Sequence, residues 1–74
     1  MTTVKRFRNC KISVYYDHGA PHFHIDGAEI RAVFDIETMT LLAGDARRAQ
    51  EALEWARSNR DLLLAEWSRL NIKG

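Results

Sequence analysis

An apolar side chain occupies almost every second position through two stretches of the chain, residues 10–16 and 22–36. This period of two is typical of β-strands that bury one face and leave the other in water. The apolar positions are Cys10, Ile12, Val14, Tyr16, Phe23, Ile25, Ile30, Ala32, Phe34 and Ile36. The first half of the chain is therefore predicted to form a sheet with one buried face.

A hairpin is predicted where Asp26 and Gly27 separate two of the alternating runs. Asp-Gly is among the strongest hairpin signals, because a two-residue type I′ turn needs positive φ at both central positions. Such a turn also fixes which residues lie opposite each other. The predicted cross-strand pairs on the polar side are His24 with Glu29 and His22 with Arg31. Both histidines are expected on the solvated face, because their neighbours Phe23 and Ile25 are directed to the core.

The other segments complete a small mixed fold. Residues 4–7 are expected to form a short first strand, and residues 40–42 a short last one. Further on, apolar residues recur at three- and four-residue steps, which predicts a helix with Asp45 as its N-cap. Polar residues at 58–59 interrupt the pattern, so two helices are expected, with a single long helix as the alternative. The prediction is a single α+β domain, residues 1–74, whose two C-terminal helices pack on one face of a mostly antiparallel sheet of three to five strands.

The single cysteine, Cys10, bears on where such a protein works. It permits no intrachain disulfide, although small secreted domains usually depend on such bonds. The N-terminal residues contain no apolar run of the kind found in signal peptides or membrane spans. A cytoplasmic protein without membrane association is therefore expected, with Cys10 buried on the apolar side of its strand.

Charge says little about partners. The net charge is +1, from 11 basic and 10 acidic residues, and argues neither for nor against nucleic acid. The first eleven residues contain no acid, and their basic members are Lys5, Arg6, Arg8 and Lys11. This basic end is compatible with an edge that faces phosphates and with ordinary solvated surface.

All three histidines lie in one segment, residues 17–24. Free imidazole has a pKa of about 6.5, so a pair of histidines can act as general acid and base near neutral pH. A carboxylate at Glu29 would orient His24, and Arg31 would bind a phosphate or a developing negative charge. This set suits cleavage of an RNA phosphodiester by its own 2′-hydroxyl, which needs no metal. The candidate catalytic residues are His18, His22, His24, Glu29 and Arg31.

Two other interpretations of the histidines stay open. Histidines at positions i and i+2 of a strand project the same way, so His22 and His24 could bind zinc or another divalent metal in a hydrolase. The third ligand could be His18, Asp17 or Glu29. Alternatively, polar side chains on a solvated sheet can simply cover the surface of a protein partner. The sequence alone does not decide whether the protein is an enzyme.

Four runs of the sequence resemble a family of small bacterial domains of unknown function, whose members carry a Pro-Pro-His-x-His box after a tyrosine-rich strand. The runs are Ile-Ser-Val-Tyr-Tyr-Asp-His at 12–18, Pro-His-Phe-His at 21–24, Ala-Val-Phe-Asp-Ile-Glu-Thr at 32–38 and Asn-Arg-Asp-Leu-Leu at 59–63. Two positions depart from the pattern, since Ala20 replaces the first proline and Met39 a usual glycine.

This resemblance implies a role in a toxin–antitoxin module. Members of the family are often encoded beside a second small domain, so a protein partner encoded nearby is expected, and RNA becomes the favoured substrate. No established catalytic residues of the family can be carried over. A homodimer also remains open, because a core as small as this one is often extended by self-association.

Overall fold

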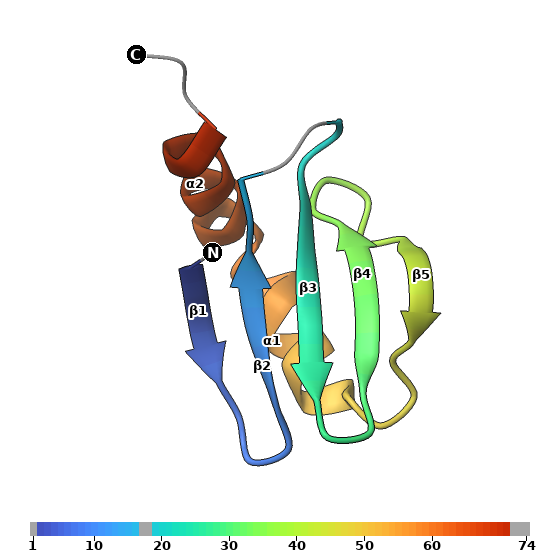
Figure 1. Ribbon diagram of the computed structural model, residues 1–74. Helices are drawn as coiled ribbons and strands as arrows, with labels where there is room; N and C mark the ends of the chain where they lie inside the picture. The colour runs from blue at the N-terminus through green and yellow to red at the C-terminus, as the bar shows by residue number, and fades with distance from the viewer. Residues whose placement is uncertain (1, 17–18, 72–74) are drawn as a thin grey trace.

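The computed structural model describes residues 2–16 and 19–71. Within these ranges, five strands form one antiparallel sheet in chain order, and two helices follow (Figure 1). The elements are β1 (Thr2–Arg6), β2 (Cys10–Val14), β3 (His22–Gly27), β4 (Arg31–Asp35), β5 (Leu41–Asp45), α1 (Gln50–Ser58) and α2 (Arg60–Asn71). The predicted α+β fold with two C-terminal helices is therefore confirmed.

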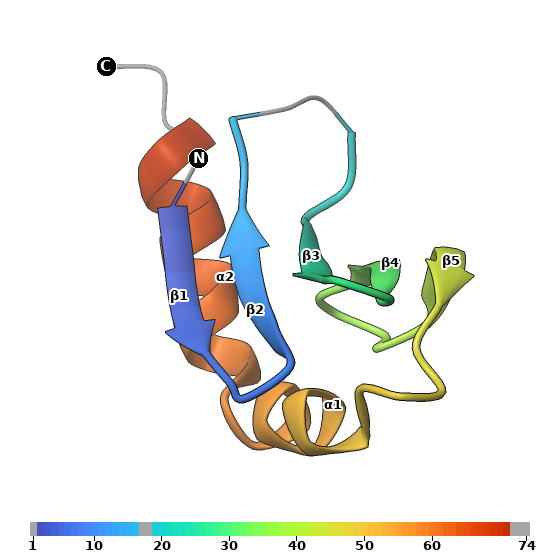
Figure 2. The same ribbon diagram turned by 60° about the horizontal axis from the view of Figure 1, so that its bottom comes forward.

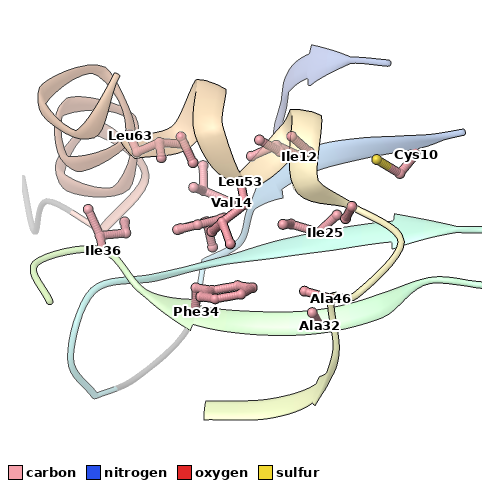
Figure 3. Close-up of a cluster of buried hydrophobic side chains, with 14 of the residues drawn as sticks. Cys10, Ile12, Val14, Ile25, Ala32, Phe34, Ile36, Ala46, Leu53 and Leu63 are labelled. Carbon is pink, nitrogen blue, oxygen red and sulfur yellow. The ribbon is translucent and has the colours of Figure 1, made fainter. Parts of the chain in front are cut away.

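The hydrophobic core lies between the helices and one face of the sheet. In Figure 3, Val14 of β2 and Ile25 of β3 lie on the face of the sheet that is turned towards Leu53 of α1. The predicted apolar positions that are buried are Cys10, Ile12, Val14, Phe23, Ile25, Ile30, Ala32, Phe34 and Ile36. The prediction was wrong for Tyr16, which is 66% exposed because β2 ends at Val14.

The hairpin between β3 and β4 turns later than Asp26-Gly27, so the predicted turn is wrong. Gly27 still belongs to β3, and its backbone N–H donates to the carbonyl of Ile30 at 2.8 Å. The strand extends this far because Gly27 pairs with Cys10 of β2. A Cβ on Gly27 would collide with the carbonyl oxygen of Asn9, and the φ of Gly27 is not left-handed. Glycine is thus required here because the turn between β1 and β2 passes close to its backbone.

Because the turn comes later than predicted, the residues on the polar face have different cross-strand partners, but no residue changes face. The observed pairs are His22 with Asp35, His24 with Val33 and Asp26 with Arg31. Each new partner lies an even number of residues from the predicted one, so every side chain keeps its predicted face. Glu29, predicted opposite His24, lies in the turn itself.

The first helix begins later than predicted. Asp45 ends β5, where it pairs with Arg31 of β4, and its carboxylate accepts the backbone N–H of Arg47 at 2.9 Å. The N-cap of α1 is Ala49, so the assignment of Asp45 as N-cap is wrong. The predicted break between two helices is confirmed, with Asn59 as the C-cap of α1. Neither helix in the described part of the chain has the length and apolar character needed to cross a membrane.

The turn between β4 and β5 has two special residues. The carboxylate of Asp35 accepts the backbone N–H groups of Thr38 at 2.9 Å and Glu37 at 2.8 Å. These bonds, first that of Thr38, lower the pKa of Asp35 below its ordinary value. Met39 has a φ of 60°, a left-handed conformation that favours glycine.

Candidate functional site

A shallow hollow lies on the sheet face that carries the histidines. It has a volume of about 490 Å³, and we refer to it as the sheet hollow. Its lining residues are Tyr15, His24, Asp26, Gly27, Ile30, Arg31 and Val33. An imidazole, a phenol, a carboxylate and a guanidinium thus border one concave surface.

His24 is half-buried in the middle of β3, and its ring is held by aromatic contacts. The ring of Tyr15 packs edge to face against it, with ring centres 4.5 Å apart. The ring of His22 lies on the same strand, with its centre 5.4 Å from that of His24. The predicted pair of neighbouring imidazoles on one face is therefore present.

His22 lies at the border between this face and the core. The ladder between β2 and β3 reaches only to Ser13 and His24, and beyond this rung the two strands diverge (Figure 2). Near this end of β3, the ring of His22 contacts the ring of Trp67 of α2, with centres 4.8 Å apart. Nδ1 of His22 donates to the carbonyl of Ala20 at 2.9 Å, so Nδ1 carries the proton of the neutral ring.

A row of charged residues crosses the same face beside His24. Cross-strand partners share a face of a sheet, and the ladder aligns one residue from each of the described strands in this row. Its members are Arg6, Lys11, Asp26, Arg31 and Asp45. Asp45 is bonded to Arg47 at 2.7 Å, so the row offers chiefly positive charge.

Only part of the predicted catalytic set comes together. Arg31 lines the sheet hollow with His24, although it lies opposite Asp26 and not His22. Glu29 is placed elsewhere, because the later turn moves it to the tip of the hairpin, where it pairs with Arg48 at 2.7 Å. The predicted contact of Glu29 with His24 is therefore wrong. His18 lies outside the described residues.

The predicted metal site is not assembled by the part of the chain that the structure describes. Among residues 2–16 and 19–71, no group of three His, Cys, Asp or Glu side chains could hold a metal ion. The predicted ligands His22 and His24 are neighbours. Of the candidates for the third ligand, Glu29 lies at the hairpin tip, and His18 and Asp17 are outside these ranges. Zinc binding by the three histidines stays a prediction.

Two neighbours of the histidines were missed by the sequence reasoning. Asp26 continues the two-residue period of His22 and His24, so it could have been placed on their face from the sequence alone. The contact of Trp67 with His22 had no such signal, because it joins the start of β3 to the last helix through tertiary packing.

Comparison with known proteins gives a family but no characterised relative. Residues 10–68, most of the chain, match the family model described as "Domain of unknown function (DUF4160)". No match was found among curated proteins or among solved structures. The matched region contains β2 to β5, both histidines described above and most of the two helices. The chain therefore belongs to the DUF4160 family of domains of unknown function.

Proposed function

We propose that this protein cleaves single-stranded RNA without a metal ion, using His22 and His24 as acid and base. The observation that carries the proposal is the pairing of the two imidazoles, whose centres are 5.4 Å apart, with Arg31 in the same hollow as His24. Rings at this spacing can both contact one phosphate group. The basic members of the charged row beside His24, Arg6 and Lys11, supply further contacts for the RNA backbone.

The reaction needs only groups that the chain and the RNA provide. One imidazole takes the proton of the 2′-hydroxyl, whose oxygen forms a new bond to the adjacent phosphorus. The bond from phosphorus to the 5′-oxygen breaks, and the other imidazole donates a proton to that oxygen. The products are a 2′,3′-cyclic phosphate and a free 5′-hydroxyl.

The neighbours of the histidines have supporting roles in this proposal. Arg31 offsets the negative charge that grows on the phosphoryl oxygens as the 2′-oxygen attacks. Tyr15 supports the ring of His24 from the side and offers an aromatic surface to a nucleobase. Stacking of this kind is sequence-tolerant, so the proposal predicts a preference for unpaired RNA and not for one sequence.

The experiment is an RNA cleavage assay with matched substrates. In the presence of EDTA, the protein should cut a labelled single-stranded RNA and leave a cyclic phosphate, while the same sequence as DNA stays intact for want of a 2′-hydroxyl. His24→Gln should lower the rate about 100-fold or more, the usual contribution of a general acid or base. Leu42→Gln, at an exposed position of β5 outside the sheet hollow, is the control and should retain activity.

Two results would contradict the proposal. Cleavage that EDTA abolishes would favour the metal-dependent hydrolase, and equal cleavage of DNA would exclude attack by the 2′-hydroxyl.

We further propose that the activity belongs to a bacterial toxin–antitoxin pair, because the sequence resembles small domains that are often encoded beside a second small domain. Expression of the protein alone should then arrest bacterial growth, and co-expression of the neighbouring gene product should relieve the arrest. The His24→Gln variant should allow normal growth. Growth arrest by a folded His24→Gln variant would mean that toxicity does not arise in the sheet hollow.

A further inference from the structure

The two edges of the sheet differ in how they are protected. β1 contacts α2, its register with β2 is irregular between Thr3 and Lys5, and its last two residues, Lys5 and Arg6, are charged. Charges and irregularities of this kind keep an edge strand from pairing with another chain. β5, at the opposite edge (Figure 1), is exposed at every residue and uncharged up to its last one. Its register with β4 is irregular only at its start, so residues 43–45 form a regular, accessible edge.

Two leucines at the start of β5 are exposed on the helix side of the sheet. Leu41 is 44% exposed and Leu42 is 55% exposed. Leu41 lies opposite Phe34, and Leu42 is two residues from Gly44, which lies opposite Ala32. Phe34 and Ala32 are buried in the core, so both leucines are directed to the core side. They are exposed because the helices pack mainly against β1, β2 and β3 and leave this end of the sheet uncovered (Figure 1).

The charges beside β5 favour a second copy of this chain as its partner. Glu37 lies before the strand and Arg47 after it, and both are exposed. Arg47 contacts Asp45, but its side chain is still 89% exposed. When two copies of β5 pair in antiparallel orientation, Arg47 of each copy comes to the side of Glu37 of the other. Two strands paired in this way are related by a twofold axis perpendicular to the sheet, so the leucines of both copies lie on one face.

We propose that two copies of this chain pair through β5 in antiparallel orientation and form one continuous sheet. The backbone groups of the two edges bond to each other, and Leu41 and Leu42 of both copies cover one another on the helix side. The net charge of +1 opposes this self-association only weakly. None of the residues that line the sheet hollow belongs to β5, so the pairing is independent of the proposed RNA cleavage.

Sedimentation velocity of the full chain tests the pairing. One pair of strands should bury less than the roughly 800 Å² per partner of a standard interface, so the dimer should exchange with the monomer. Between roughly 10 μM and 1 mM, the average mass should therefore rise from the monomer value towards twice that value. Leu42→Lys places a charge on the edge and should keep the protein monomeric throughout.

The matched control is Leu62→Lys, the same change at a leucine of α2 that is also 44% exposed. It should dimerise like the wild-type protein, and both variants should keep the wild-type circular dichroism spectrum. Dimerisation of Leu42→Lys at the wild-type level would overturn the proposal. A wild-type protein that is monomeric at the highest concentration would overturn it too, even if β5 then bound the neighbouring gene product.

Cysteine cross-linking tests the orientation of the strands. In a twofold pair of antiparallel strands, the residue on the axis lies opposite its own copy. Under mild oxidation, Leu42→Cys or Ala43→Cys should therefore form a covalent dimer, whereas Leu62→Cys should not. The native Cys10 is buried and is not expected to react. If neither variant in β5 links, or if Leu62→Cys links equally well, the antiparallel pairing is excluded.

Discussion

Along β3, neighbouring residues belong to two different regions of the molecule. Phe23 and Ile25 have no exposed surface and pack in the core, whereas His22 and His24 are half-buried on the face with the sheet hollow. A core side chain is surrounded by apolar neighbours, while the ring of His24 contacts the rings of Tyr15 and His22 at the border of the sheet hollow. Substitutions at adjacent positions of one strand should therefore have separate consequences, for stability on the core face and for chemistry on the polar face.

The largest effect is expected from Phe23→Ala. Phe23 is fully buried and stacks on Phe34, with ring centres 5.5 Å apart. The cavity should lower the free energy of unfolding by about 3–5 kcal/mol, a large part of the stability of a small domain. Urea unfolding followed by circular dichroism measures it, with Phe23→Leu as the milder control. A loss below about 1 kcal/mol would show that the core face is not what stabilises the sheet.

A smaller effect is expected at Met39, which packs against the core in a left-handed conformation. Met39→Gly and Met39→Ala both remove the side-chain contact, but only glycine relieves the backbone. The glycine variant should be more stable than the alanine variant by about 1 kcal/mol. Thermal unfolding of the two proteins measures the difference. Equal stabilities would mean that the turn does not impose its φ on this residue.

The smallest effect is expected at Asp35, which lies opposite His22 in the ladder. The pKa of its carboxyl is lowered, first by the N–H of Thr38, from an ordinary value of 3.8. The ionised carboxylate therefore stabilises the fold above about pH 4. This contribution is lost as the pH falls through the lower pKa of the folded state.

The measurement for Asp35 is the melting temperature as a function of pH. Asp35→Asn keeps an oxygen that can accept the two N–H groups, but it has no charge to lose. The wild-type protein should lose its advantage over Asp35→Asn below about pH 4. A constant difference down to pH 2 would exclude the carboxylate as its source.

The sequence predicted the faces of the sheet better than its pairing. Alternation is a local property, so Phe23 and His24 could be assigned to opposite faces without knowledge of the partner strands. The turn at Asp26-Gly27 was wrong because pairing with β2 extends β3 to Gly27, and that pairing is a tertiary effect. Glu29 consequently moved from the candidate site to the hairpin tip.

For the candidate site, too, the sequence predicted which residues share a face but not which side chains they contact. The shared face of His22, His24 and Arg31 followed from the period of two, and the sheet hollow contains two of them. The burial of Ser13 and the contact between His22 and Trp67 depend on how neighbouring strands and α2 fill the space around them. No sequence pattern carries that information.

The proposed separation of stability and chemistry along β3 is best tested with His24→Ala, by measuring unfolding and RNA cleavage on the same preparation. We predict a free energy of unfolding within about 1 kcal/mol of wild type, because the ring is half-buried and lies outside the core. RNA cleavage should fall about 100-fold or more. Cleavage at the wild-type rate, or a loss of stability as large as that of Phe23→Ala, would contradict the division between the two faces of β3.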